Sequence, residues 1–285
     1  MAQDALVTPP ADQVAADVAR ALAEDIGTGD ATAGLLEDAP ARAYVVAKEA
    51  AVIAGRPWFD ACFLALDPAA DIAWRIAEGE RVAAGTVVCT IAGRARALVS
   101  AERCALNFLQ TLSGTATRTA EYVAALAGTR TRVLDTRKTL PGLRVAQKYA
   151  VRAGGGCNHR VGLYDAVMLK ENHIHAAGSI AAAAARARAL HPALPLIIEV
   201  ESLDELEQAL ATGCTRILVD DFSEADLREA VRRAAGRIPL EVSGGVELAR
   251  LHDIGATGVD YVSVGALTKH VHAIDLSMRL GIPPA

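Results

Sequence analysis

In the second half of the chain, charged and hydroxyl-bearing residues come directly after short apolar runs. The segments that follow these six runs are Asp135-Thr136-Arg137-Lys138, Lys170-Glu171-Asn172, Glu199-Val200-Glu201, Asp220-Asp221, Ser243-Gly244-Gly245 and Gly265. If the runs are strands of a parallel sheet, their carboxyl ends share one edge, and these residues meet there. One such residue alone would be explained as a helix N-cap. Six segments that combine cations, carboxylates and glycine turns indicate a binding site.

Cationic side chains are concentrated in one stretch of a chain whose formal net charge is −5. Between residues 130 and 160 the only acid is Asp135, and the basic residues are Arg130, Arg132, Arg137, Lys138, Arg144, Lys148, Arg152 and Arg160. A solvated surface would account for an arbitrary basic run. Here the cations flank the turn-forming Pro141-Gly142 and the glycine-rich residues 153–156. The planar guanidinium of arginine binds a carboxylate through two hydrogen bonds, so the stretch predicts a small ligand with several carboxylates and phosphates.

The segment Ser243-Gly244-Gly245 offers backbone N–H groups and a hydroxyl at the start of an expected helix. Unpaired donors and the helix dipole favour a phosphate at such a position. Any tight turn after a strand can use the same residues. In barrels, however, phosphate sites often follow the last two strands, and Gly265 follows the last apolar run. The two segments together predict a phosphate cradle.

The histidines allow two interpretations. His159 is either a general acid or donor to a carboxylate, or simply a hydrogen-bonded loop side chain. His173 and His175 are two residues apart and point to different faces of a helix or strand, which argues against a histidine-based metal cluster. The metal that the sequence favours is Mg²⁺, held by Glu199, Asp220 and phosphate oxygens of the ligand.

The first part of the chain predicts an α+β domain. The length of 285 residues permits one large domain or two ordinary ones, and 52% hydrophobic against 22% charged residues indicates a folded protein. The expected elements are a helix at 14–23, a loop at 24–30, strands at 43–47, 52–54 and 72–76, a helix at 58–66 and a hairpin at 78–92.

A long helical pattern at 100–126 leads into alternating strands and helices. The expected strands are 133–134, 166–169, 196–200, 217–219, 240–242 and 261–264, and the expected helices are 180–190, 203–211, 224–235 and 247–254. This alternation predicts a parallel sheet with right-handed crossovers. Six strands are too few for a complete eight-stranded barrel, so an incomplete barrel and an open doubly wound sheet both fit.

Composition excludes several classes of protein. The acidic net charge and an aromatic content of 4% argue against a nucleic-acid binder and against an anionic-membrane binder. The 5 cysteines are widely spaced and form no C-x-x-C pair, which argues against a disulfide framework or a zinc ribbon. No stretch is apolar enough to span a membrane, and the N-terminal residues do not form a leader pattern. We therefore expect a cytoplasmic protein that does not bind membranes.

The segment from Leu134 to Arg160, LDTRKTLPGLRVAQKYAVRAGGGCNHR, resembles the quinolinate phosphoribosyltransferase family (nicotinate-nucleotide pyrophosphorylase, carboxylating). The same resemblance extends to Lys170-Glu171-Asn172-His173, Glu199-Val200-Glu201, Val219-Asp220-Asp221-Phe222, Ser243-Gly244-Gly245 and Val264-Gly265-Ala266. It also includes the early residues 24–30 and 101–107. It therefore covers nearly the whole chain, and its central run is long and specific.

The resemblance implies an α/β fold with two domains. Residues 1–112 would form an N-terminal α/β sandwich domain, with the tail 271–285 packed on it. Residues 113–270 would form an incomplete, open α/β barrel that carries catalysis and phosphate binding. The implied enzyme is a pentosyltransferase of NAD biosynthesis, whose substrates are quinolinate and phosphoribosyl pyrophosphate. It would be a homodimer with shared active sites, or a larger assembly of such dimers.

The resemblance also implies roles for individual residues. Arg103 would enter the partner subunit's site. The quinolinate carboxylates would be bound by Arg137, His159, Arg160 and Lys170, with Thr136 and Lys138 beside them. Glu199 and Asp220 would serve the ribose hydroxyls and Mg²⁺, and these two would be catalytic together with Lys138 and Lys170. The 5′-phosphate would be held by Ser243, Gly244, Gly245, Val264, Gly265 and Ala266. The chain departs from the family pattern at Glu171, where Asp is usual, and at Asp221, where Asn is common.

Two other functions remain open at this point. The first is a related phosphoribosyltransferase that acts on another base, such as the homologue associated with molybdate transport genes. The second is a non-catalytic sensor of anionic metabolites, against which the set Lys138, Lys170, Glu199 and Asp220 argues. Quinolinate-dependent release of CO₂ would separate the expected enzyme from both.

Overall fold

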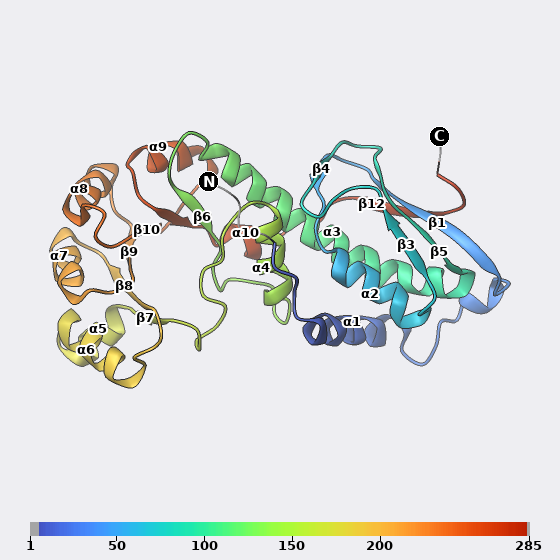
Figure 1. Ribbon diagram of the computed structural model, residues 1–285, viewed down its shortest axis with the longest axis horizontal. Coiled ribbons are helices and arrows are strands. Elements are labelled where there is room, and N and C mark those ends of the chain that lie inside the picture. The colour runs from blue at the N-terminus through green and yellow to red at the C-terminus, as the bar shows by residue number, and fades with distance from the viewer. Residues whose placement is uncertain (1–5, 284–285) are drawn as a thin grey trace. The chain divides into compact units, whose positions relative to one another are not determined.

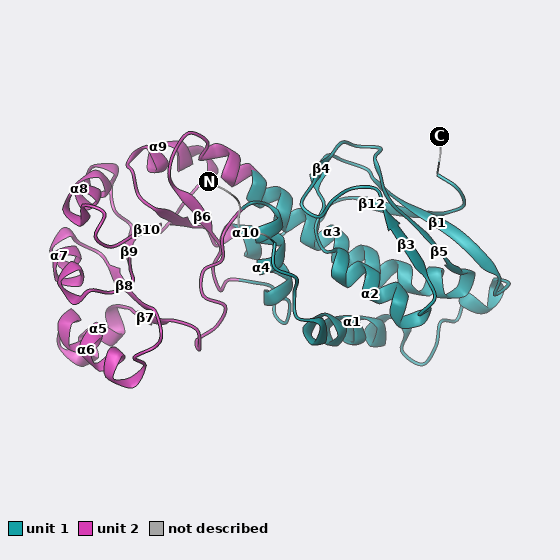
Figure 2. Cartoon of the chain, in the orientation of Figure 1, with its two compact units in different colours: residues 1–120, 139–155, 267–285 teal, residues 121–138, 156–266 magenta. Residues whose placement is uncertain are grey.

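The computed structural model describes residues 6–283. Its contacts divide the chain into two compact units that alternate along the sequence (Figure 2). Unit 1 comprises residues 1–120, 139–155 and 267–285, and unit 2 comprises residues 121–138 and 156–266. The domain boundary between residues 112 and 113 stays a prediction.

Unit 1 is built on an antiparallel sheet with the strand order β12-β1-β5-β3. The strands of this unit are β1 (Pro40–Ala47), β2 (Ala51–Val52), β3 (Asp71–Trp74), β4 (Arg81–Val82), β5 (Val87–Arg94) and β12 (Leu276–Leu280), of which β2 and β4 form a separate pair. Strand β12 pairs with β1, so this part of the tail 271–285 belongs to the sheet of unit 1. Residues 284–285 lie outside the described range.

The three helices that the sequence predicts before residue 130 are all longer in the structure. These three are α1 (Ala11–Ile26), α2 (Arg56–Leu66) and α3 (Ala95–Ala125), and the further helices are η1 (Ala33–Leu35), α4 (Arg144–Ala153) and α10 (Ala266–Lys269). The prediction of a loop from Glu24 onward is wrong for its first three residues, because α1 continues through Ile26. The helix ends at Gly27, which has a φ of +54° and donates its N–H to the Ala23 carbonyl. Glycine tolerates this left-handed conformation better than other residues.

An aromatic helix face forms the centre of unit 1. The side chains of Trp58, Phe59 and Phe63 in α2 are at most 1% exposed. Ala146 and Ala150, four residues apart on α4, have no exposed surface and belong to the same core. Residues four apart lie on one face of a helix, so α4 buries this face in unit 1. The contacts of α4 therefore group this helix with unit 1, and the expectation that residues 113–270 form one domain stays a prediction.

Unit 2 contains a six-stranded parallel sheet with the order β6-β11-β10-β9-β8-β7. Its strands are β6 (Arg132–Leu134), β7 (Val167–Leu169), β8 (Leu196–Val200), β9 (Arg216–Asp220), β10 (Leu240–Ser243) and β11 (Tyr261–Ser263). From β7 to β11, each strand lies beside the next one in sequence, so the connections always advance in one direction. A doubly wound sheet would reverse direction at a switch point. The unit is therefore an open α/β barrel, and the incomplete barrel is confirmed over the doubly wound sheet.

The helices of unit 2 cover one side of this sheet (Figure 1). They are α5 (Glu171–Ala177), α6 (Ile180–Leu190), α7 (Leu203–Thr212), α8 (Glu224–Ala234), η2 (Leu248–Arg250) and α9 (Leu251–Ala256). The side chains of Ser179, Ser202 and Ser223 each accept a backbone N–H at the start of a helix. Such N-caps fix where α6, α7 and α8 begin. The helix expected at 247–254 instead consists of η2 followed by α9.

The two faces of the parallel sheet differ in chemistry because side chains alternate along each strand. One face carries buried aliphatic residues that support the helices: Val133, Leu169, Ile198, Val219, Val242 and Val262. The other face is mixed: it carries the polar residues Arg216, Asp220, Glu241, Ser243 and Tyr261 together with apolar residues such as Ile197 and Leu218. This second face is the interior of the open barrel. Polar groups therefore lie within the barrel as well as at its edge.

All five cysteines are buried and none forms a disulfide. Burial raises the pKa of Cys62 to about 12, and burial together with the nearby Asp25 carboxylate raises the pKa of Cys104 to about 11. A raised thiol pKa keeps the neutral thiol at pH 8, whereas the thiolate is the reactive form. We expect a thiol-specific disulfide reagent at pH 8 to label few or none of the thiols until the protein is denatured. Rapid labelling of Cys62 or Cys104 in the folded protein would contradict this burial.

Candidate active site

The carboxyl edge of the parallel sheet brings together most of the residues singled out in the sequence. It contains Thr136, Arg137, Lys138, Lys170, Glu199, Asp220, Ser243, Gly244, Gly245, Val264, Gly265 and Ala266, which lie at or directly after the ends of the six strands. All of them belong to unit 2. Arg103 lies on α3 in unit 1, where it is exposed.

His159 and Arg160 reach this edge through a short extension of the sheet. Cys157 forms a parallel bridge with Leu134, in which the Cys157 N–H donates to Val133 O at 2.8 Å. The buried Asp135 carboxylate then accepts Asn158 Nδ2 at 2.6 Å and the backbone N–H of His159 at 2.8 Å. The end of β6 therefore fixes the loop that carries His159 and Arg160.

Arg160 lies within electrostatic range of a second arginine, Arg137. The pKa of Arg160 is lowered by burial and by the positive charge of Arg137, an effect that Asp165 opposes. Arg160 Nη1 donates to the Ala166 carbonyl at 3.2 Å, which holds its side chain near the start of β7. Two cations held near each other raise the local potential and favour binding of an anion. A ligand with two carboxylates matches this pair.

A lysine and two carboxylates occupy the next three strand ends. Lys170 Nζ lies 2.5 Å from Glu199 Oε2, and the lysine side chain is 48% exposed whereas that of Glu199 is 14% exposed. Glu199 pairs in register with Leu218, so Asp220, two residues further along β9, lies on the same face. One cation and two carboxylates thus face the same space at the sheet edge.

The carboxylates of Glu199 and Asp220 are suitable ligands for Mg²⁺. Residues 6–283 contain no group of three or more His, Cys, Asp or Glu side chains arranged to hold a metal ion by themselves. Protein sites for Mg²⁺ commonly use one or two carboxylates, and substrate phosphates supply further oxygens. The residues therefore fit an ion that is shared with a phosphorylated substrate.

The turn after β10 brings backbone close to Asp220. Gly244 has a φ of +89°, and a Cβ there would lie 3.0 Å from the Asp221 nitrogen and 3.2 Å from Asp220 Oδ1. Asp221 itself has a φ of +57°, a left-handed conformation that Asn and Asp adopt more readily than most residues. The backbone at this position therefore favours Asp or Asn over most other residues. The turn continues through residues 246–247 into η2.

We expect Gly244→Ala to lower kcat/KM by about tenfold, because the new methyl group displaces Asp220 and the left-handed φ strains the turn. Steady-state kinetics and a thermal melt would measure the two effects. Gly236→Ala is the matched control, since Gly236 has a φ of +71°, nothing lies within 4 Å of the position that its new methyl group would take, and it precedes β10, away from the strand ends of the site. Equal losses in the two variants would mean that backbone strain alone, and not the approach to Asp220, lowers the activity.

A second glycine, which follows the neighbouring strand β11, lies close to a lysine side chain. A Cβ at Gly265 would lie 2.9 Å from Lys138 Cδ and 3.5 Å from Thr136 Oγ1. Thr136 Oγ1 accepts the backbone N–H of Lys138 at 3.0 Å, and Val264 N donates to Leu134 O at 2.9 Å. The ends of β6 and β11 thus form one surface of backbone and cationic side chain, next to the start of α10.

Several polar residues of the site are not apparent from the sequence. Asp135 stands out there only as the one acid of a basic run, although it holds the loop of His159. Glu241 and Arg216 lie inside strands, whereas the polar residues apparent from the sequence follow strand ends. The alternation in Glu241-Val242-Ser243 is a signal that could have found Glu241, but Arg216 precedes three apolar residues and gives no such signal.

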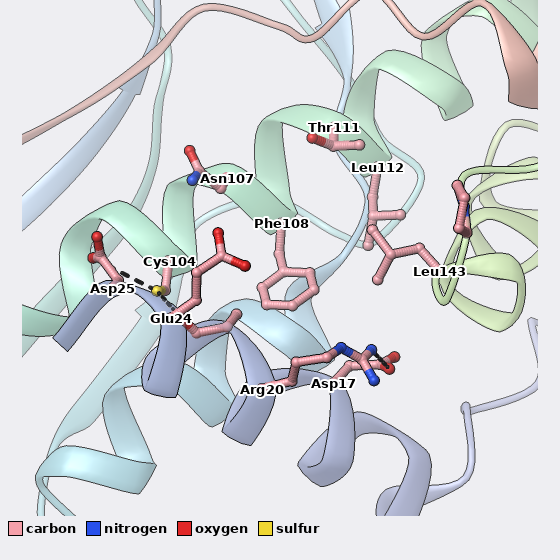
Figure 3. Close-up of a pocket in the computed structure, with 12 residues that line it drawn as sticks. Asp17, Arg20, Glu24, Asp25, Cys104, Asn107, Phe108, Thr111, Leu112 and Leu143 are labelled. Atoms are coloured by element: carbon pink, nitrogen blue, oxygen red, sulfur yellow. Dashed lines mark hydrogen bonds and ion pairs between the residues drawn. The ribbon is translucent and has the colours of Figure 1, made fainter. Parts of the chain in front are cut away.

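Unit 1 contains a pocket of a different character (Figure 3). It has a volume of about 300 Å³ and lies between α1, α3 and residues 141–143. Asp17, Glu24 and Asp25 line it together with one cation, Arg20, which already pairs with Asp17 at 2.8 Å. An excess of carboxylates repels a ligand rich in carboxylates and phosphates. The anion site is therefore assigned to the sheet edge of unit 2.

Both halves of the chain match described protein families. Residues 28–113 match "Quinolinate phosphoribosyl transferase, N-terminal domain", and residues 115–279 match "Quinolinate phosphoribosyl transferase, C-terminal domain". A probable nicotinate-nucleotide pyrophosphorylase (carboxylating) from Synechocystis is 48% identical over 265 residues, which cover 91% of this chain and 90% of that protein.

Two further comparisons agree. A mitochondrial quinolinate phosphoribosyltransferase (decarboxylating) from Nicotiana tabacum is 40% identical over 91% of this chain and 80% of its own length. Among solved structures, the nicotinate-nucleotide pyrophosphorylase from Francisella tularensis superposes with a TM-score of 0.94 at 44% identity, covering 98% of this chain and 100% of that one. The similarity therefore extends over both sequence and fold.

Proposed function

The chain belongs to the quinolinate phosphoribosyltransferase family, and we propose that it forms nicotinate mononucleotide from quinolinate and phosphoribosyl pyrophosphate, a step of NAD biosynthesis. Pyrophosphate and CO₂ are the other products. The observation that carries this proposal is that Arg137, Lys170, Glu199 and Asp220 lie at one sheet edge, which the loop of Arg160 joins through the bridge between Cys157 and Leu134. A site for two carboxylates thus adjoins groups suited to an activated sugar phosphate.

In this proposal the pyridine diacid is bound by cations from three segments. Arg137 follows β6, Arg160 lies on the loop that Asp135 holds, and Lys170 follows β7. His159 belongs to the same subsite, and Thr136 and Lys138 border it. Bidentate arginine contacts orient a carboxylate as well as bind it, so they fix the direction of the ring nitrogen.

The sugar phosphate is bound by the remaining strand ends. Glu199 and Asp220 accept hydrogen bonds from the ribose hydroxyls. The backbone N–H groups of Ser243, Gly244 and Gly245, with those of Val264, Gly265 and Ala266, hold the 5′-phosphate. Two glycine-containing turns without bulky side chains allow the phosphate to approach the backbone closely.

The reaction proceeds in two stages. The quinolinate ring nitrogen forms a bond to C1 of the ribose while the bond from C1 to the pyrophosphate oxygen breaks. Positive charge develops on the ribose in this step, and Glu199 and Asp220 stabilise it, while Lys138 and Lys170 stabilise the departing pyrophosphate. The alkylated ring is cationic, so the carboxylate next to the nitrogen leaves as CO₂ and its electron pair remains as an ylide. Protonation of that carbon completes the nicotinate ring.

Mg²⁺ is the cofactor that we propose for this site. Glu199 and Asp220 would hold it together with oxygens of the sugar phosphate. When bound, it would neutralise charge on the pyrophosphate group. The carboxylates also bind the ribose, so their roles toward metal and sugar are linked.

The direct test uses purified protein, quinolinate labelled in its 2-carboxylate, phosphoribosyl pyrophosphate and Mg²⁺. We expect labelled CO₂ and nicotinate mononucleotide in equal amounts. Nucleotide formation from another base without release of CO₂ would favour the related phosphoribosyltransferase. Tight binding of quinolinate without turnover would favour the metabolite sensor.

We further propose a homodimer in which Arg103 of each subunit completes the partner's site. Arg103 is exposed on α3, as an intermolecular role requires. Directly after Arg160, the loop of unit 2 exposes Leu163 and Tyr164 by 71% and 73%. The Asp165 carboxylate holds this loop by accepting the N–H groups of Val161 and Gly162 at 2.7 and 3.0 Å. An ordered loop with exposed apolar side chains beside the anion site is suited to contact with a second subunit.

Mixing two inactive variants tests the shared site. Arg103→Ala and Arg137→Ala should each be inactive alone. After subunit exchange in an equal mixture, about a quarter of the wild-type activity should return, because half of the dimers are mixed and each has one intact site. A mixture that stays inactive although mixed dimers form would contradict shared sites.

We also propose that the enzyme works in the cytoplasm. Five buried cysteines without a disulfide are typical of a reducing compartment. Within residues 6–283, no helix has both the length and the apolar character needed to cross a bilayer.

A further inference from the structure

We propose that Glu241 is a positioning residue for the diacid subsite and that it acts through His159. This inference rests on the proposed function, because it concerns how that subsite is held. Glu241 lies in the middle of β10, on the interior face of the open barrel, and its side chain has no exposed surface. It does not belong to the strand ends where the ligand is expected.

One oxygen of the Glu241 carboxylate lies close to two side chains, those of Arg216 and His159. Its Oε2 atom lies 2.9 Å from Arg216 Nη1 and 3.4 Å from His159 Nε2. Burial by itself would raise the pKa of Glu241, but its interactions with His159 and Arg216 outweigh burial and lower it. Glu241 is thus a carboxylate at neutral pH. It can only accept hydrogen bonds.

These contacts determine the tautomer of His159. The backbone N–H of Arg160 donates to His159 Nδ1 at 2.6 Å, so Nδ1 carries a lone pair. The ring proton is therefore on Nε2, the nitrogen that faces the Glu241 carboxylate. The ring accepts a hydrogen bond at Nδ1, and its Nε2 makes an electrostatic contact with the Glu241 carboxylate at 3.4 Å without forming a hydrogen bond, so groups on both sides bear on the orientation of the ring. Glu241 and the Arg160 N–H thus hold the ring from opposite sides.

His159 in turn contacts Arg160, the arginine that we propose binds the substrate. His159 accepts the N–H of Arg160 itself, and the Asp135 carboxylate accepts the N–H of His159 at 2.8 Å. The backbone at residues 159–160 is therefore held by Asp135 on one side and by the ring of His159 on the other. Loss of Glu241 would remove one of the contacts that orient the ring and would weaken the hold on Arg160.

Arg216 keeps the carboxylate in place. Its guanidinium lies 4.6 Å from the centre of the Tyr261 ring, which belongs to β11 and lies on the same interior face of the sheet. This stacking orients the donor that anchors Glu241 Oε2. The other oxygen, Oε1, is buried and has no hydrogen-bond partner among residues 6–283.

A role in stability alone explains the buried pair of Glu241 and Arg216 poorly. Buried charge pairs cost desolvation energy, and apolar residues of similar shape are often as stable. The unpartnered Oε1 adds a further cost. If Glu241 served stability alone, replacing the pair with apolar residues would leave quinolinate binding unchanged. If it positions His159, binding of quinolinate should weaken while the fold remains stable.

Two variants distinguish these roles. Glu241→Gln keeps an oxygen that can accept from His159, whereas Glu241→Met combined with Arg216→Met removes the acceptor without leaving Arg216 unpaired. We expect the double variant to fold and to raise KM for quinolinate by about tenfold or more, with KM for phosphoribosyl pyrophosphate changed by less than about threefold. Glu241→Gln should recover most of that loss.

Glu78 offers a matched control, because it is also a mostly buried carboxylate and accepts the backbone N–H of Gly55 at 2.6 Å in unit 1. Glu78→Gln should not change the ratio of the two KM values. Thermal melts of all variants would show whether any effect follows stability alone. An unchanged KM for quinolinate in the folded double variant would overturn the proposal.

Nitrogen-15 NMR of the histidine rings provides a readout independent of activity. Using a His159→Gln sample to assign the signal, we expect protonated Nε2 and unprotonated Nδ1 in the wild type, and a mixture of tautomers in the double variant. A wild-type ring protonated on Nδ1 would refute the proposal even if the enzyme is active. An inactive wild type with the expected tautomer would instead contradict the proposed function and leave the contact between Glu241 and His159 intact.

Discussion

Replacing Arg137 with alanine should lower kcat/KM for quinolinate by about 100- to 10,000-fold. Arg137 follows β6 at the sheet edge and supplies one of the two guanidiniums of the proposed carboxylate subsite. Each charge-assisted hydrogen bond contributes about 1.5–3 kcal/mol, and two such bonds to one carboxylate correspond to this range. Steady-state kinetics with each substrate varied in turn would measure the loss, which should fall mainly on quinolinate.

Arg130 provides the control for this variant. It precedes β6, whereas Arg137 follows it, and it forms an ion pair with Asp260. Arg130→Ala removes the same charge from the other end of the strand and should change kcat/KM by less than about twofold, as expected for an exposed ion pair. Normal kinetics in Arg137→Ala, or an equal loss in both variants, would refute the assignment of Arg137 to the carboxylate subsite.

Lys170 and Glu199 should behave as one functional unit. Their charged groups are 2.5 Å apart and connect the ends of β7 and β8. Lys170→Met or Glu199→Gln should each lower kcat/KM by about 100- to 1,000-fold, because each variant removes a group at the reacting centre and also releases its partner. The double variant should be only slightly worse than either single variant, since residues that act together give non-additive losses.

The same double-mutant cycle can contradict this account. If the two losses multiply in the double variant, Lys170 and Glu199 act independently, and the ion pair has no role in catalysis. Lys269, exposed in α10, allows a control for the loss of a lysine charge alone. Lys269→Met should leave kcat/KM within about twofold of the wild type.

The parallel sheet could be predicted from the sequence because each strand is a short apolar run with a polar end. The sheet contains the six expected strands, and the polar segments that follow them meet at one edge. Strand order could not be predicted, since local patterns do not encode neighbours. The order in the structure distinguishes the open barrel from the doubly wound sheet.

Helix ends are predicted less well, because they depend on the surrounding structure. Gly27 and not Glu24 ends α1, and α4 is not among the expected helices because its basic residues are interpreted only as part of a ligand-binding stretch. The small residues Ala146 and Ala150 bury one face of α4 in the core of unit 1. Such tertiary packing overrides the local pattern.

The site is predictable where function depends on residue type at a strand end. Arg137, Lys170, Glu199 and Asp220 are of this kind. Glu241 is not predictable in this way, because its role depends on a contact with His159, which is 82 residues earlier in the chain. The role of Arg103 depends on a second subunit and stays a prediction.

A crystal structure with bound quinolinate and an unreactive analogue of phosphoribosyl pyrophosphate would test the central claim most directly. We predict that Arg137, Arg160 and Lys170 contact the two carboxylates at the carboxyl edge of the parallel sheet, with the sugar beside Glu199 and Asp220. A diacid bound elsewhere, with these three cations directed into separate regions of solvent, would contradict the enzymatic account.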